Sequence, residues 1–176
     1  SENLLELRVD ISGGPHGRYG FRGAELHLVA VSYPDQFLPA DLCSVPRTLT
    51  EDGKALGALL LGTMSHPPDC IVTARLLGAV DLRSIDHMAC YLVAVAAADP
   101  HFDDVVDLAG LSHYRRNHLE RFFQLHYGAD SRGGWQEPIV AHELLHRARQ
   151  SYRLAQAEKR EKLLSEPAWR PISPAS

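Results

Sequence analysis

The most recognisable chemical motif in the chain is residues 142–146, which read H-E-L-L-H. On a helix, an H-E-x-x-H spacing places two imidazoles on one face, where they bind zinc in metalloproteases while the glutamate acts as a base. A zinc site needs at least three converging ligands. No histidine follows His146, and the later glutamates lie on the same predicted helix or in the polar tail. We therefore interpret the motif as coincidental in a chain with 10 histidines.

Composition excludes several classes of protein. The net charge is −4, and the 18 lysines and arginines are spread along the chain, whereas a general nucleic-acid binder concentrates them in a positive stripe. No apolar run approaches the ~20 residues that span a bilayer, and the sequence shows no leader pattern. We expect a cytoplasmic protein without nucleic-acid or membrane partners.

We predict that the cysteines, His66 and His101 have no role in catalysis or metal binding. Cys43, Cys70 and Cys90 are odd in number and lack a metal-type spacing, so we predict reduced, mostly buried thiols. His66 and His101 lie beside prolines in turns, where we expect them to be solvated.

The first two thirds of the chain show strand patterns. Any functional site in this part of the chain must therefore be positioned by strands. Alternating or continuous apolar runs predict strands over residues 5–11, 25–31, 58–61, 70–80 and 90–97. Residues 32–50 carry three prolines and predict a loop with short extended pieces.

Helical periodicity begins in the last third. Residues 112–127 predict a helix that ends at Gly128, and Pro138 opens a longer helix with an apolar face. The charged, proline-containing end predicts a frayed or disordered tail. We expect a single domain over 1–158 and a tail over 159–176, with a β-rich body closed into a small barrel.

Six short runs, in order, carry a resemblance to a known family. They are LGAVDL at 77–82, LVAV at 92–95, DPHF at 99–102, VVDLAGL at 105–111, LERFF at 119–123 and GGW at 133–135. Together they resemble the soluble magnesium-dependent inorganic pyrophosphatases over about residues 70–153, and more thinly over 4–50. The resemblance implies an α+β, mainly β fold: a five-stranded OB-like closed barrel with two C-terminal helices. It also implies an active site in the barrel mouth and a homo-oligomer, a hexamer or a trimer.

The resemblance further implies a set of aspartates that hold magnesium ions around pyrophosphate. The family motif D-G-D-P-x-D falls on residues 52–57. Asp52 matches its first aspartate, but Lys54 and Gly57 stand where the second and third aspartates are expected.

Other family positions are also changed. In the next metal loop, Ser84 and Ala89 stand at aspartate positions, and Tyr91 stands at a lysine position. The Tyr-Lys pair that follows the family's Phe-Phe falls at His126 and Tyr127, or at Tyr127 and Gly128 if one residue is inserted.

The first strands show similar exchanges. Asp10 stands where a glutamate is usual, Arg18 where a substrate lysine is usual, and Ala30 where a phosphate-gripping arginine is usual. Of the family's carboxylates, Asp10 and Asp52 therefore remain. We expect this remnant to bind magnesium or another divalent metal only weakly, because two carboxylates cannot hold a cluster of metal ions.

The residues that replace the carboxylates suggest a different ligand. The predicted mouth combines cationic, aromatic and imidazole side chains: Arg18, Lys54, Ser84, His87, Tyr91, His126 and Tyr127. This set suits a small organic anion better than a metal-bound diphosphate. We predict an enzyme that has left pyrophosphate hydrolysis and acts on such a ligand. The catalytic candidates are His126, Tyr91, Arg18 and Tyr127, and the substrate-binding candidates are Lys54, Ser84 and His87.

Two other functions stay open on the sequence alone. In the first, the chain is a catalytically inactive paralogue that binds a ligand or a partner. In the second, it is a weak inorganic diphosphatase. The second of these would use Asp10, Asp52 and a divalent metal.

Overall fold

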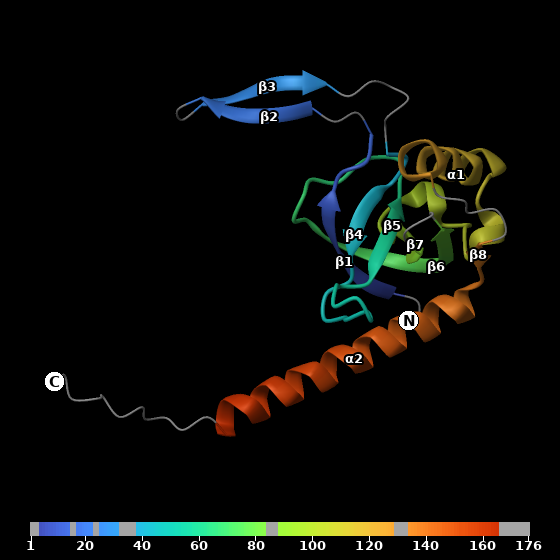
Figure 1. Ribbon diagram of the computed structural model, residues 1–176. Coiled ribbons are helices and arrows are strands. Elements are labelled where there is room, and N and C mark those ends of the chain that lie inside the picture. The colour runs from blue at the N-terminus through green and yellow to red at the C-terminus, as the bar shows by residue number, and fades with distance from the viewer. Residues whose placement is uncertain are drawn as a thin grey trace.

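The computed structural model describes residues 4–14, 17–22, 25–31, 38–83, 88–128 and 134–165. Five strands close into a barrel: β1 (Leu4–Ile11), β4 (Asp41–Ser44), β5 (Gly57–Leu61), β7 (Met88–Ala96) and β6 (Ile71–Arg83). β6 pairs back onto β1, which completes the closure. The β5–β7 pair is parallel and the other barrel pairs are antiparallel, so the barrel is mixed (Figure 1).

Two buried clusters lie on opposite faces of the barrel wall, as the two-residue alternation of strands requires. One cluster contains Leu60 and Leu92 and packs against Ala141 and Leu145 of the second helix. The other contains Leu59, Val93 and Phe123, the last from the first helix. β5 is therefore buried on both faces, which explains its nearly continuous apolar sequence.

The two helices follow the barrel strands in the chain. α1 (His113–Tyr127) begins after Ser112, whose side chain accepts a hydrogen bond from the Arg115 backbone N–H, and ends at Gly128 with φ 59°. α2 (Pro138–Ser165) follows the two-residue strand β8 (Trp135–Gln136), which pairs with β6. Short 3₁₀ turns lie at Pro100–Phe102 and Leu108–Gly110.

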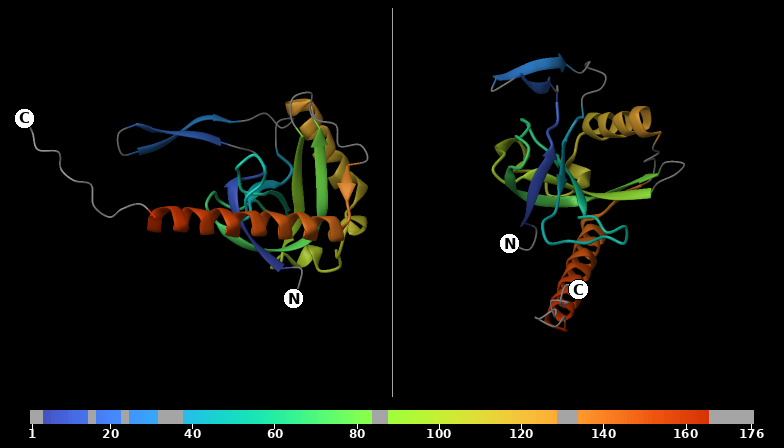
Figure 2. Two further views of the ribbon diagram at one scale, coloured as in Figure 1. Left: turned by 60° about the horizontal axis from the view of Figure 1, so that its bottom comes forward. Right: turned by 60° about the vertical axis from the view of Figure 1, so that its left-hand side comes forward.

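A separate antiparallel hairpin stands apart from the barrel (Figures 1 and 2). It is formed by β2 (Gly17–Arg22) and β3 (Glu25–Val31). We predicted β3 with its observed bounds, but neither β2 nor β8, and β4 lies in the segment expected to hold short extended pieces.

The predicted architecture of a five-stranded barrel with two C-terminal helices is confirmed. α2 continues through residues 159–165, where we expected the tail to begin, and residues 166–176 lie outside the described residues. The domain boundary at 158 stays a prediction. Within the described residues, no helix has both the length and the apolar character needed to cross a membrane.

Candidate functional site

Strand pairing brings together several residues that the sequence motifs singled out. Ser44 of β4 pairs with Gly57 of β5. Ala58 pairs with Leu92 in the parallel β5–β7 ladder, so Gly57 lies beside Tyr91. The family motifs place an aspartate and a lysine at these last two positions. The register therefore shows that Gly57 and Tyr91 are neighbours in space.

The ring of Tyr91 lies directly over the backbone of Gly57. A Cβ atom built on Gly57 would stand 2.7 Å from Cδ1 and 2.8 Å from Cε1 of that ring. Tyr91 also stacks on Phe123 of α1, with ring centroids 6.1 Å apart and planes inclined by 30°. Phe122 meets Phe123 edge to face at 5.5 Å. An aromatic cluster therefore occupies the space that a side chain at residue 57 would need.

Asp10, near the end of β1, lies next to Ser44. Its Oδ1 atom accepts a hydrogen bond of 3.2 Å from the Ser44 hydroxyl and lies 3.5 Å from Nε of Arg8. Arg8 in turn pairs with Ser44 across the β1–β4 ladder. The charge of Asp10 is therefore already shared with a neighbouring guanidinium group. We call Asp10, Ser44, Gly57 and Tyr91 the candidate site.

Asp52 is engaged within its own turn. The Thr50 hydroxyl donates to Asp52 Oδ1, and Nζ of Lys54 lies 3.8 Å from Oδ2. The hydrogen bond from Thr50, with a smaller contribution from Lys54, lowers the pKa of Asp52. The side chain that replaces the motif's second aspartate therefore neutralises the first.

These donors do not fit a cluster of magnesium ions. Among the described residues, no group of three or more histidines, cysteines, aspartates and glutamates could hold a metal ion. Gly57 contributes no ligand, Tyr91 fills the adjoining space, and Lys54 adds positive charge.

The remaining predicted site residues are only partly described. Arg18 pairs with Ala30 across the β2–β3 hairpin, and its side chain lies outside the description. His126 and Tyr127 form the last turn of α1, next to Phe122 and Phe123, and their side chains are likewise not described. Ser84 and His87 lie outside the described residues. The roles proposed for these residues therefore stay predictions.

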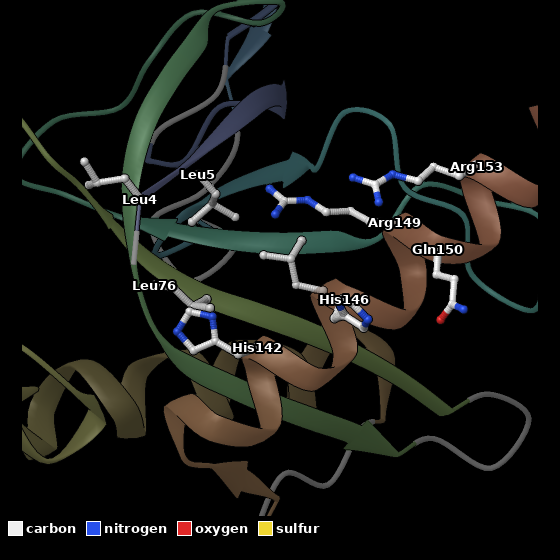
Figure 3. Close-up of a pocket in the computed structure, with 9 residues that line it drawn as sticks. Leu4, Leu5, Leu76, His142, His146, Arg149, Gln150 and Arg153 are labelled. Atoms are coloured by element: carbon white, nitrogen blue, oxygen red, sulfur yellow. The ribbon is translucent and has the colours of Figure 1, made fainter. Parts of the chain in front are cut away.

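The H-E-x-x-H residues lie on α2, which packs against a different core cluster from the one that Tyr91 contacts. His142 and His146 line a pocket beside α2, together with arginines of the same helix (Figure 3). His142 is half-buried and His146 is exposed. Within the described part of the chain, they belong to no group of three or more histidine, cysteine, aspartate or glutamate residues that could hold a metal ion.

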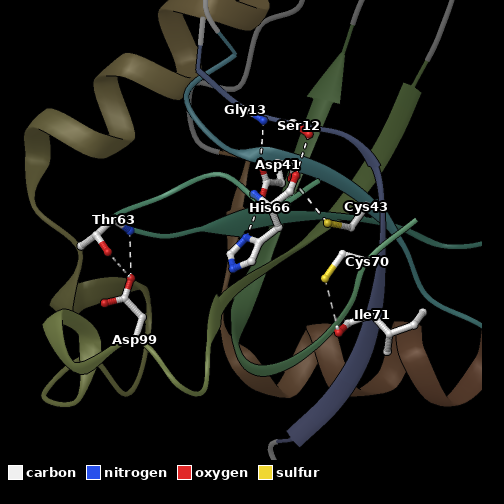
Figure 4. Close-up of polar contacts among 9 residues, drawn as sticks. All are labelled: Ser12, Gly13, Asp41, Cys43, Thr63, His66, Cys70, Ile71 and Asp99. Carbon is white, nitrogen blue, oxygen red and sulfur yellow. Dashed lines mark hydrogen bonds and ion pairs between the residues drawn. The ribbon is translucent and has the colours of Figure 1, made fainter. Parts of the chain in front are cut away.

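A buried Asp41–His66 pair was missed by the sequence interpretation (Figure 4). The carboxylate of Asp41 is almost fully buried and accepts hydrogen bonds from the Gly13 N–H at 2.5 Å, the His66 N–H at 3.0 Å and His66 Nδ1 at 2.8 Å. His66 was expected to be solvated, and this was wrong, because its ring turns inward to Asp41. The pair fastens the loop after β5 to the start of β4, and no local sequence signal connects two residues so far apart.

The cysteines behave as structural thiols. All three are free, Cys43 is buried, and Cys70 and Cys90 are half-buried. Desolvation by burial is the main cause that raises the pKa of Cys43 and of Cys90 to about 12. Neither thiol is therefore a nucleophile at neutral pH.

Comparison with known proteins agrees with the fold. A family model described as inorganic pyrophosphatase matches residues 9–153. The chain therefore belongs to the inorganic pyrophosphatase family. An inorganic pyrophosphatase of Geobacillus stearothermophilus is 26% identical over 149 residues, covering 81% of this chain and 90% of the relative. One of Saccharolobus solfataricus is 29% identical over 127 residues, covering 70% and 73%.

Solved structures support the same fold. The inorganic pyrophosphatase of Helicobacter pylori superposes with a TM-score of 0.71 at 24% identity, over 87% of this chain and 95% of that one. The Thermus thermophilus enzyme gives a TM-score of 0.69 at 22% identity, over 86% and 92%. At these identities the likeness establishes the barrel and its helices.

Proposed function

We propose that this chain is a pyrophosphatase-family protein that no longer hydrolyses inorganic diphosphate efficiently and instead takes a small organic anion in its barrel mouth. The observation that carries the proposal is the contact of Tyr91 with Gly57, where a Cβ atom would meet the ring at 2.7 Å. A third aspartate of the metal motif cannot be accommodated there while the ring is in place. Without that ligand, two exposed carboxylates, each beside a cation, are poor magnesium ligands.

The organic anion is inferred from what replaces the carboxylates. Lys54 supplies a mobile ammonium group, and Tyr91 supplies an aromatic surface and a hydroxyl. Arg18 and His126 are the further participants expected from the family positions. A histidine and a tyrosine near neutral pH are suitable for general acid–base chemistry, which contributes roughly 100-fold or more to a rate.

Native mass spectrometry of the purified protein tests the ligand. We expect a small organic anion to co-purify with the wild type and to be lost from a Lys54→Ala/Tyr91→Ala variant. The exposed Glu51→Gln is a matched control in the same turn and should retain the ligand. If no ligand is carried, or if the double variant carries it equally well, the mouth does not bind it.

Tyr91→Phe then separates an enzyme from a binding protein. The substitution keeps the ring on Gly57 and Phe123 and removes only the hydroxyl. For an enzyme that uses this hydroxyl, turnover of the identified ligand should fall by roughly 100-fold in a variant that circular dichroism shows to be folded. Unchanged turnover would remove Tyr91 from catalysis.

A weak inorganic diphosphatase is the second candidate, favoured because the curated relatives are named inorganic pyrophosphatases. Under this alternative Asp10 and Asp52 share a divalent metal, and Asp52→Asn abolishes a slow, metal-dependent release of phosphate. Residual activity that is insensitive to Asp52→Asn would argue against it. The expected homo-oligomer, a hexamer or a trimer, is a separate prediction that light scattering tests.

A further inference from the structure

Two adjoining pockets lie between α2 and the start of β1, with volumes of about 500 Å³ and 640 Å³. They share Leu4, Leu5, Arg149 and Arg153. We call their combined space the α2 pocket. Each volume is in the range of small-molecule sites. Leu5 and Leu145, which line the α2 pocket, belong to the core cluster on one face of the barrel wall. Tyr91 packs against the cluster on the other face.

Cationic side chains converge on the α2 pocket. Arg47, Arg149 and Arg153 all line it, and none of them forms an ion pair with a carboxylate among the described residues. Glu6 is the acidic residue in the described lining. In a chain of net charge −4, three arginines at one pocket that form no ion pair with a described carboxylate are a local excess of positive charge.

The helical spacing explains how α2 supplies these cations. His142, His146, Arg149 and Arg153 recur every three or four residues, so they follow one edge of the helix. Figure 3 shows His142, Arg149 and Arg153 directed to the same side, toward β1 and β6. The stripe from residue 142 to residue 153 extends about 16 Å along the axis.

The barrel side of the 500 Å³ pocket is apolar. It contains Leu4, Leu5 and Leu76 (Figure 3), and Leu145 of α2 also lines this pocket. Arg47 enters from the turn after β4 with φ 58°, a left-handed conformation that is uncommon outside glycine. Strained backbone of this kind persists where surrounding structure fixes it.

From this geometry we infer a second ligand site in the α2 pocket, separate from the candidate site and specific for an anion that carries two or more phosphate groups. Each guanidinium group presents a planar fork of donors that matches a phosphate. Arg47, Arg149 and Arg153 bind neighbouring phosphates, and the leucine wall accommodates an organic part such as a nucleoside. An inorganic phosphate chain also binds the arginines, but it has no organic part to contact the leucine wall.

Isothermal titration calorimetry with ATP and with inorganic triphosphate, both in EDTA so that neither is hydrolysed, tests the site. We expect wild type to bind both probes. Arg149→Ala/Arg153→Ala should raise Kd by at least about 30-fold, because it removes two charge-assisted contacts. Both side chains are exposed, so the variant should fold, and circular dichroism checks this.

Two controls decide where the probes bind. Arg160→Ala/Lys162→Ala removes the same charge from the same helix outside the α2 pocket, and Arg121→Ala removes an exposed cation of α1. Each should leave Kd within about twofold of wild type. If ATP binds more tightly than triphosphate, the leucine wall contacts the organic part of the ligand. If the two bind equally, the site recognises the phosphate groups alone. Absence of binding, or equal weakening by the controls, would overturn the site.

Discussion

Tyr91 and Gly57 are complementary in shape: the ring of one covers the bare backbone of the other, 2.7 Å from where a Cβ would stand. Gly57 begins β5 and Tyr91 lies in β7, and the parallel ladder fixes them side by side. The two positions are therefore sterically coupled. A glycine is needed because the ring is present, and the ring has room because residue 57 has no side chain.

Restoring the aspartate should be destabilising on its own. We expect Gly57→Asp to lower the free energy of unfolding by about 1–3 kcal/mol, because the ring or the strand must move. In a double-mutant cycle measured by urea unfolding, Gly57→Asp should cost at least about 1 kcal/mol less in a Tyr91→Ala background. Ala55→Asp, at an exposed position in the same loop, should change stability by no more than about 0.5 kcal/mol. Additive effects in the cycle would mean that the contact does not limit the site.

Asp41 should be among the most sensitive polar positions. Asp41→Asn replaces a buried acceptor of three hydrogen bonds and should lower stability by about 2–4 kcal/mol. Asp104→Asn, at an exposed position, is the matched control and should be nearly neutral. Thermal unfolding followed by circular dichroism measures both. Equal effects would show that the Asp41–His66 pair does not hold the loop.

Asp99 predicts a pH dependence of the loop after β7. Its carboxylate accepts hydrogen bonds from the Thr63 N–H at 2.8 Å, the Thr63 hydroxyl at 3.0 Å and the His101 N–H at 3.1 Å. The bond from the Thr63 backbone is the main cause that lowers the pKa of Asp99. A lowered pKa stabilises the folded state above the ordinary aspartate pKa, and this contribution is lost as the pH falls through the folded value.

The Asp99→Asn variant isolates this effect. Its unfolding midpoint should lie below that of wild type at pH 7, and the difference should shrink as the pH falls through the lowered pKa of Asp99. Urea unfolding at a series of pH values measures it. A difference that does not change with pH would show that the charge of Asp99 is not involved.

Thiol labelling should report the raised pKa values. At pH 8, Cys43 and Cys90 should react with iodoacetamide far more slowly in the folded protein than in urea, because a pKa of about 12 leaves almost no thiolate. The folded state retains these protons longer than the unfolded chain, so stability should decrease as the pH rises above about 9. Peptide mass mapping identifies the labelled sites. Rapid labelling of Cys43 in the folded protein would contradict its burial.

Strands with strong periodicity were predictable from the sequence, and those with little apolar content were not. β3 was predicted with its observed bounds, and β5, β6 and β7 to within a few residues. β2 reads GRYGFR and β8 has two residues, so neither carries an alternating apolar pattern. Barrel closure through β1 and β6 depends on contacts between distant residues, and the resemblance to a family supplied it.

The candidate site was predictable by position and not by contact. Motif spacing identified Gly57 and Tyr91 separately, whereas the packing of the ring on the glycine follows from the parallel register. The α2 pocket could not be predicted either, because it also depends on contacts between residues far apart in the sequence. The sequence singled out residues 142–146, but Leu4 and Arg47, which complete the pocket, come from the other end of the chain.

Phosphate release from pyrophosphate, with magnesium, manganese and zinc each supplied, tests the central claim most directly. An ordinary family member, such as the Geobacillus stearothermophilus relative, is assayed in parallel. We predict that turnover by this chain lies at least about 1000-fold below that of the relative with every metal, because the lost ligands act together on one transition state. Turnover near that of the relative with any of the three metals would contradict the proposal and make this chain a working inorganic pyrophosphatase.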